Sequence, residues 1–324
     1  MPDALDFEQP LYELETRIAE LAARDETPAL RDEISRLEDR LTRLRQKTFA
    51  ALTPWQRTQL ARHVRRPHTR DLCRLLFDDF LELHGDRLYG DDPAVVGGLA
   101  RFEGRSVVVV GHQKGRETRE KIARNFGMPH PEGYRKALRL MQLGEKFAKP
   151  VLTLIDTPGA YPGIGAEERG QGEAIARNLL TMAELRVPIV AVVTGEGGSG
   201  GALAIAVADR VFMLEHAVYS VISPEGCAAI LWNDAGKAPE AAGLMRITAP
   251  DLLRLGVIDG IIPEPPGGSH RDFGTTAASV RDTVRDALAA LSAKTLDVLV
   301  AERYDKFRRI GIFEEESRLT HPPR

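Results

Sequence analysis

The stretch PIVAVVTGEGGSGGALAIAVA, residues 188–208, joins three kinds of segment in one short run. Pro188–Thr194 is apolar and β-branched, which is typical of a strand covered on both faces. Gly195–Gly201 follows with five glycines in seven residues, and Ala202–Ala208 then has a helix-like composition. A strand, a glycine bend and a helix start in this order predict one unit of a layered α/β fold.

The middle of the chain repeats this alternation. Four more strand-like runs lie there, namely Val107–Val110, Val151–Ile155, Val211–Leu214 and Val218–Ile222. Helical segments separate several of them, most clearly Gly133–Phe147 and Glu168–Glu184. We therefore expect an α/β fold whose parallel strands are joined by crossover connections.

The first ninety residues have a different pattern. Leucine and isoleucine recur every three or four residues in two stripes, over residues 11–21 and 30–44, among many Arg and Glu residues. Pro28 separates the stripes, so we expect a helical hairpin, which either packs on its own domain or contacts another subunit. A third helix is expected over Thr69–Leu83.

The end of the chain is again helical in pattern. Pro263–Gly268 is expected to form a loop, and apolar residues then recur near a helical period from Thr275 to about Tyr304. These shifts predict an N-terminal helical region at residues 1–90, an α/β core at 91–265, and a C-terminal helical segment at 266–324 that completes the core domain.

Composition excludes several classes of protein. The chain has 324 residues, 43% of them hydrophobic and 28% charged, as in ordinary globular proteins. Its two cysteines, Cys73 and Cys227, cannot build a disulfide scaffold or a four-cysteine zinc site. A net charge of −3 argues against a general nucleic-acid surface, and no apolar run reaches the ~18 residues of a membrane span. Met1–Pro10 is acidic and unlike a secretory signal, so we expect a cytoplasmic protein.

A second glycine segment, Asp156–Gly165, follows the expected strand Val151–Ile155. Glycine lets backbone N–H groups approach a ligand closely, and the first N–H groups of a helix have no partner within the helix. Both segments are therefore candidate sites for an anion or a developing oxyanion. The second segment also begins Asp-Thr-Pro-Gly like a GTPase switch, but the phosphate-binding motif G-x-x-x-x-G-K-[ST] does not occur in the sequence.

Other interpretations of the first glycine segment remain open at this point. Gly195–Gly200 fits a dinucleotide fingerprint, with Glu215 about twenty residues further on, although the following helix is short for that fold. Gly197–Gly201 fits a nucleophile elbow, with His216 or His270 as possible bases. Tight turns without a ligand are a further possibility. Backbone stabilisation of an oxyanion asks only for free N–H groups, and one such donor typically contributes ~3–4 kcal/mol.

Long motifs then narrow the choice. They are Gly111–Thr118, Asn125–Pro129, Pro131–Ala137, Asp156–Gln171, Gly195–Gly201, Ser223–Cys227 and Ile262–Pro265, together with the opening Leu5–Pro10. Over nearly its whole length the chain resembles the alpha subunit of the bacterial acetyl-CoA carboxylase carboxyltransferase. The resemblance implies a crotonase-like fold, a spiral of ββα units, with the helical N-terminal region as an extension.

The resemblance also implies a reaction and partners. The family transfers the carboxyl group of N1-carboxybiotin, held on the biotin carboxyl carrier protein, to acetyl-CoA, which gives malonyl-CoA for fatty acid biosynthesis. The ureido group left behind takes the methyl proton, so no protein base is needed. The implied partners are a zinc-ribbon beta subunit, the carrier protein and biotin carboxylase. The family's pattern implies two alpha with two beta subunits, and no metal is expected in this chain.

By the same resemblance, the amides of Gly200 and Gly201 bind the ureido oxygen of biotin. Gly163 and Ile164 are chosen, from loop placement alone, as a facing pair of donors. The thioester oxygen belongs to the beta side. A stand-alone acyl-CoA hydratase or hydrolase of the same fold, and a non-catalytic scaffold that binds a carrier, remain the alternatives.

Four further residues are candidates for substrate binding. Tyr161 either packs on biotin or is a core aromatic at a turn. Lys114 and Arg116 lie in a basic stretch that either meets coenzyme A phosphates or an acidic carrier, or forms a solvated helix face; Arg135 is similar. His112, after a buried strand, is expected to be a core histidine.

Overall fold

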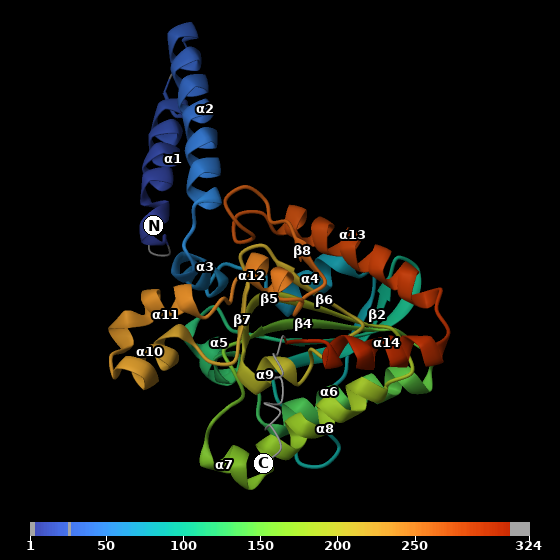
Figure 1. Ribbon diagram of the computed structural model, residues 1–324. Coiled ribbons are helices and arrows are strands. Elements are labelled where there is room, and N and C mark those ends of the chain that lie inside the picture. Colours follow the sequence, from blue (N-terminus) through green and yellow to red (C-terminus); the bar gives the residue numbers. More distant parts are fainter. Residues whose placement is uncertain (1–3, 25–26, 312–324) are drawn as a thin grey trace, which may run out of the picture.

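An eight-stranded mixed sheet forms the centre of the molecule, in the order β1-β2-β3-β4-β5-β6-β8, with β7 paired to β5. The structure is a computed structural model and describes residues 4–24 and 27–311. Helices cover both faces of the sheet, and a two-helix arm extends away from it (Figure 1). The ends of the predicted regions, residues 1–3 and 312–324, lie outside the described residues.

Two parts of the sheet differ in strand direction. β1 to β3 are antiparallel, and β3 to β6, β7 and β8 run parallel to their neighbours. The strands are β1 (Phe80–Glu82), β2 (Val95–Phe102), β3 (Arg105–His112), β4 (Val151–Thr157), β5 (Ile189–Gly198), β6 (Arg210–Leu214), β7 (Val218–Ser220) and β8 (Gly260–Ile262). The valines of β3 and the whole of β4 are buried, so the predicted runs are strands covered on both faces.

Helices from distant parts of the chain cover the two faces. α6 (Pro131–Lys146) packs against β2, β3 and α8 (Gln171–Glu184) on one face (Figure 1). α4 (Thr69–Leu76) and α13 (Phe273–Ser292) pack together on the other face. Crossovers of this kind are what parallel strands require.

Three expected helices differ in length from the prediction. The helix expected over Thr69–Leu83 ends at Leu76, because the chain becomes extended at Phe77 and then pairs as β1 with β2. The expected C-terminal helix is two helices, α13 and α14 (Leu296–Arg308), since Thr295 caps a new start. The helix expected over residues 202–208 is the single turn α9 (Ser199–Leu203).

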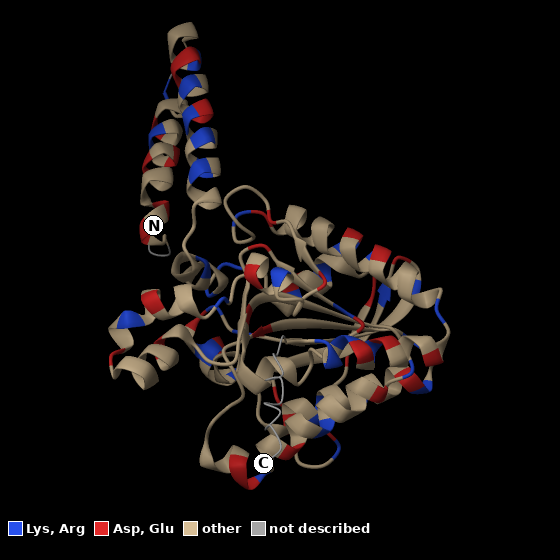
Figure 2. Cartoon of the chain, viewed as in Figure 1, with Lys and Arg blue, Asp and Glu red and all other residues tan. Residues whose placement is uncertain are grey.

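The arm consists of α1 (Gln9–Ala22) and α2 (Pro28–Ala50), which lie side by side as the leucine stripes predict (Figure 1). Both signs of charge alternate along its surface (Figure 2). Its base is packed into the body by a cluster of five buried residues: Leu11, Leu41, Phe49, Leu52 and Leu60. The last of these lies in α3 (Pro54–Ala61), a helix that sequence patterns did not indicate.

Shorter elements complete the chain. They are α5 (Thr118–Ala123), α7 (Ile164–Glu168), α10 (Pro224–Trp232), α11 (Ala238–Leu244), α12 (Ala249–Arg254) and three 3-10 turns, η1 (Asp6–Glu8), η2 (Asn125–Gly127) and η3 (Ala235–Lys237). None of the described helices has the length and apolar character needed to cross a bilayer.

A buried arginine fixes the last helix to the body. Arg303 of α14 bonds both oxygens of Asp209, at 2.8 and 2.9 Å. Its remaining donors reach the carbonyl oxygens of Met182, Leu185 and Val187 at 2.7–2.9 Å. All five N–H groups of the guanidinium are thus engaged, which removes the main cost of burying its charge.

Candidate active site at the glycine loops

The two glycine segments lie next to each other at one edge of the sheet. β4 and β5 are parallel neighbours, so the loops that follow them leave from the same end, and Thr157 is paired with Gly197. The contact is so close that a Cβ atom on Gly198 would lie 2.1 Å from the carbonyl oxygen of Pro158. Glycine at position 198 is therefore what allows the two loops to pack.

Gly201 meets the other loop in the same way. A Cβ atom on Gly201 would lie 2.4 Å from the amide nitrogen of Ala160 and 2.8 Å from the Tyr134 hydroxyl oxygen. The same atom on Gly200 would meet nothing closer than Ile175, at 3.8 Å. Close packing thus requires glycine at 201 but not at 200.

The amides of Gly200 and Gly201 are available to a ligand. Both belong to the first turn of α9, where N–H groups have no acceptor within the helix. In the described part of the chain, no oxygen accepts a hydrogen bond from either amide. Neighbouring Ser199 is exposed and has a φ of +57°, a left-handed conformation that is strained for serine.

A largely apolar cavity of about 480 Å³ opens beside Gly200. It is lined by Ser199, Gly200 and Leu203 of α9, by β7 and the residues after it, and by the segments around α12. Among its lining residues are Tyr219, Val221, Ile222, Cys227, Met245 and Ile247. An apolar wall next to unpartnered amides suits a ligand that carries one polar edge.

Below the loops, a network of buried and half-buried charges joins three strand ends. The ammonium of Lys114, after β3, lies 2.8 Å from Asp156 Oδ1 and 3.0 Å from Glu196 Oε2. Arg62 bonds Glu196 at 2.6 Å and Glu225, in the first turn of α10, at 2.5 Å. The network therefore links the foot of the arm to the glycine loop and to α10.

The charged groups in this network keep one another ionised. Burial alone would raise the pKa of Asp156, but the Lys114 ammonium more than offsets it, and the pKa of Asp156 lies below its ordinary value. Burial would likewise lower the pKa of Lys114, and Asp156 with Glu196 raises it instead. Lys114 therefore remains a cation whose charge is already paired inside the protein.

The other predicted binding residues also have internal partners. Arg116 bonds Asp71 at 2.6 Å, and Arg135 bonds Asp86 at 2.8 Å. The Tyr161 ring stacks on His130 with a centroid separation of 4.3 Å. These contacts hold the loops of Arg116 and Tyr161, and the first turns of α6 that carry Arg135, in place.

Gly163 and Ile164 lie apart from Gly200 and Gly201. They begin α7, which Figure 1 places at the far end of the Asp156–Gly165 loop from α9. The Ile164 side chain is 80% exposed, and the Tyr161 ring covers Gly163, where a Cβ would lie 2.3 Å from Tyr161 Cε1. The structure thus does not bring the two predicted donor pairs together within this chain.

Sequence reasoning missed the residues that support the glycine loop. Arg62 gave no signal, because its partner Glu196 is 134 positions away in the sequence. Tyr134 lies in the motif Pro131–Ala137 and Ala160 in the motif Asp156–Gln171, but only the fold places them against Gly201.

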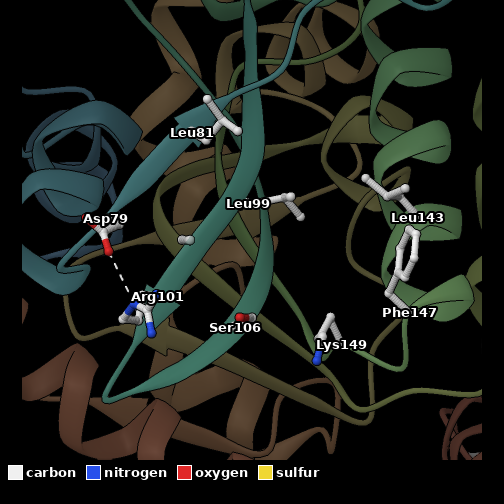
Figure 3. Close-up of a pocket in the computed structure, with 9 residues that line it drawn as sticks. Asp79, Leu81, Leu99, Arg101, Ser106, Leu143, Phe147 and Lys149 are labelled. Atoms are coloured by element: carbon white, nitrogen blue, oxygen red, sulfur yellow. Dashed lines mark hydrogen bonds and ion pairs between the residues drawn. The ribbon is translucent and has the colours of Figure 1, made fainter.

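A second cavity, of about 430 Å³, lies at the opposite end of the parallel strands (Figure 3). It is lined by Leu81 and Leu99 of the antiparallel strands, by Ser106 at the start of β3, and by Lys149 just before β4. The Asp79–Arg101 ion pair, at 3.2 Å, closes one side. This cavity is therefore separate from the glycine loops.

One buried group of residues has the donor types of a metal site. One ligand atom each of Glu8, His63 and His270 lies within 4.8 Å of the others. The group has contacts within the protein, since the amide of Arg65 donates to His63 Nδ1 and His270 Nε2 lies 3.0 Å from Glu8 Oε1. These contacts connect η1 to the body.

Comparison with known proteins gives relatives over the full length of the chain. A family model described as acetyl co-enzyme A carboxylase carboxyltransferase-like matches residues 4–311. The acetyl-coenzyme A carboxylase carboxyl transferase subunit alpha of Geobacter metallireducens is 57% identical over 312 residues, 96% of this chain and 98% of the relative. The protein of the same name from Shouchella clausii is 56% identical over 322 residues, 99% of each chain.

Solved structures share the fold at lower identity. Transcarboxylase 12S with methylmalonyl-coenzyme A bound superposes with a TM-score of 0.58 at 24% identity, over 70% of this chain and 42% of that one. A Pseudomonas malonate decarboxylase hetero-tetramer in complex with coenzyme A gives a TM-score of 0.55 at 18% identity, over 68% and 91%.

The sheet, the paired glycine loops and these likenesses define a crotonase-like fold, and the family model adds that the chain is of the carboxyltransferase class. The chain belongs to the acetyl-CoA carboxylase carboxyltransferase family, and within it to the alpha subunits. The predicted fold class, family and carboxyltransferase activity are confirmed, and the stand-alone hydratase is not favoured.

Proposed function

We propose that this subunit takes part in carboxyl transfer from carboxybiotin to acetyl-CoA by binding the ureido oxygen of biotin with the amides of Gly200 and Gly201. The observation that carries the proposal is that both amides lack an acceptor among the described residues and that Gly200 lines an apolar cavity, with Gly201 directly behind it in the same helical turn. Carboxybiotin, when bound, supplies the carboxyl group and the ureido anion that takes the methyl proton.

The role of the chain in this reaction is electrostatic. Two N–H groups fixed in the folded protein stabilise negative charge without reorganising, and each donor of this kind contributes about 3–4 kcal/mol. The apolar residues around the cavity exclude water, which strengthens those hydrogen bonds. The ion pairs of Lys114 and Arg62 keep the strand ends that carry the loops in place.

The remaining expected site residues are part of the same proposal. Gly163 and Ile164 would offer their donors to the partner side of the site, and Tyr161 would line the approach to biotin. Lys114, Arg116 and Arg135 would act through the carboxylates that they bind rather than by direct contact with phosphate.

We also propose the assembly that goes with this activity. The name of the relatives, a subunit alpha, supports a separate beta subunit, which would bind the thioester oxygen and carry the zinc ribbon. The biotin carboxyl carrier protein and biotin carboxylase complete the system, in the cytoplasm, with two alpha and two beta subunits. The regions 1–90, 91–265 and 266–324 would serve as the N-terminal region that carries the arm, the core, and the helices that complete the core domain.

A reconstitution experiment tests the proposal. The purified chain is assayed with and without the beta subunit for malonyl-CoA decarboxylation that depends on free biotin. Turnover is expected only when both chains are present. Activity of this chain alone on an enoyl-CoA or acyl-CoA would instead support the hydratase or hydrolase, and binding of the carrier without any turnover would support a scaffold.

A further inference from the structure

The carbonyl group of Gly201 lacks the partner that a longer helix would give it. After α9 the chain tightens: the Ile205 amide bonds the Ala202 oxygen at 3.3 Å, and the Ala206 amide bonds the Leu203 oxygen at 2.9 Å. No amide in the described part of the chain is hydrogen-bonded to the oxygen of Gly201, although Gly201 is buried. A buried carbonyl of this kind needs a donor from elsewhere.

His112, at the end of β3, supplies the side chain that faces it. The imidazole is fully buried and interacts with the backbone of Gly201, in a contact looser than a full hydrogen bond. Neither ring nitrogen makes a full hydrogen bond with any residue of the described chain. Burial lowers the pKa of His112 to about 4, so the ring is neutral at pH 7 and carries one N–H donor.

The backbone at this point needs an external anchor. Gly200 and Gly201 are consecutive residues without side chains to restrict φ and ψ, and α9 is a single turn. The packing of Gly201 against the Ala160 amide fixes the position of its Cα, but a rotation about ψ would still redirect the neighbouring peptide groups. A hydrogen bond to the Gly201 carbonyl would restrict that rotation.

We propose that His112 is a positioning residue for carboxyl transfer: in the active complex its imidazole contact with Gly201 tightens to a hydrogen bond on the Gly201 carbonyl oxygen, which orients the Gly200 and Gly201 amides toward the bound oxyanion. The inference rests on the proposed function of those amides. His112 does not touch the substrate. It restricts the backbone of the one-turn helix α9 on the side away from the ligand.

The test compares two replacements of His112 in the assembled complex with the beta subunit. His112→Leu fills the space without a donor, and His112→Asn keeps a donor. We expect His112→Leu to lower kcat about 100-fold while KM for malonyl-CoA and for biotin stays within about two-fold, since orientation and not substrate binding is lost. His112→Asn should recover at least about ten-fold of that loss. Thr153→Val, which removes a buried unpartnered hydroxyl elsewhere in the sheet, is the control and should leave kcat unchanged.

Hydrogen–deuterium exchange of residues 199–206 gives a readout apart from turnover. Exchange should be faster in His112→Leu than in the parent complex and restored in His112→Asn. The inference is overturned if His112→Leu retains full kcat, if His112→Asn is no better than His112→Leu, or if only KM changes. A parent complex that is itself inactive would instead overturn the proposed function.

If His112→Leu does not assemble, ¹⁵N-histidine spectra of the parent complex decide the question. A neutral His112 ring with one slowly exchanging, hydrogen-bonded N–H supports the inference. A ring without a hydrogen-bonded N–H overturns it.

Discussion

Arg66 and Glu264 form a buried ion pair with two hydrogen bonds, of 3.0 Å from Nη1 to Oε2 and 2.6 Å from Nη2 to Oε1. Arg66 also donates twice to the carbonyl oxygen of Thr194, the residue before the glycine segment. Glu264 accepts hydrogen bonds from the amides of His216 and Ser269. The pair thus connects the start of the glycine loop to the loop that precedes the closing helices.

This pair predicts a particular loss of stability in acid. Burial would raise the pKa of Glu264, but Arg66 and the other donors bring it down to about 2. Because the unfolded value is about 4.3, the folded state is stabilised above that pH and loses the contribution as the pH falls toward 2. The difference corresponds to about 3 kcal/mol.

Urea unfolding between pH 7 and pH 2.5 checks this prediction. Glu264→Gln should be less stable than the parent at pH 7, and the gap should narrow as the pH falls below about 4.5. If the free energies of unfolding of the parent and of Glu264→Gln differed by the same amount at every pH in this range, the low pKa of Glu264 would be contradicted.

Gly201→Ala should abolish most carboxyl transfer. The added carbon has no room beside the Ala160 amide, so the loop must shift. The Gly201 N–H group then no longer points at the bound oxygen. Loss of one such donor typically costs 10²- to 10³-fold in kcat. Steady-state rates of the complex with the beta subunit measure the effect.

Gly172→Ala is the matched control, because a Cβ there meets nothing within 4 Å and the residue lies in α8. It should keep normal activity and should not lower stability. If Gly201→Ala were as active as this control, the amide at 201 would have no part in the reaction.

Ser199→Ala should leave carboxyl transfer within about three-fold of the parent, since backbone amides and not the hydroxyl are assigned the task. Ser199→Gly should be at least as stable as the parent, because it relieves a left-handed serine that costs roughly 1–2 kcal/mol. Turnover and thermal unfolding are the measurements. Complete loss of activity in Ser199→Ala, together with labelling of the parent by a fluorophosphonate, would instead support the nucleophile-elbow interpretation, in which Ser199 is the nucleophile of a serine hydrolase.

Arg303→Met should destabilise the chain by about 3–5 kcal/mol, because it leaves the Asp209 carboxylate buried without its cation. Arg285→Met provides the comparison, since Arg285 pairs with Asp282 and Asp286 on the exposed side of α13. That change should stay within about 0.5 kcal/mol. If the two substitutions lowered the free energy of unfolding equally in urea, the buried Arg303–Asp209 pair would contribute no more to stability than the exposed pairs of Arg285.

Apolar patterning predicts the elements that are covered on both faces and those that bury one clear stripe. The valines of β3, the runs of β4 and β5, and the leucine stripes of the arm all fold as their spacing predicts. It failed for β1, β2 and β8. β1 and β8 have only three residues each, and β2 carries Gly97 and Gly98, which weaken its strand signal.

The site was predictable only in part, because its glycines form a local pattern in the sequence but its supporting residues do not. Glycine next to a strand end shows in the sequence, and Gly200 and Gly201 are placed where free amides were expected. The residues that support them are distant in sequence: Arg62, His112 and Tyr134 come from three separate elements, and only the folded chain brings them to one place. Charge partners such as Asp71 for Arg116 are likewise set by the fold and not by local pattern.

The tight fit at Gly201 also limits how such a protein can diversify. Because even one carbon atom is excluded there, a lineage whose cavity came to take a different ligand would have to change elsewhere. Val221, 80% exposed, and Met245 line the cavity without such crowding, so they are the places where inherited variation could alter preference and leave the chemistry intact.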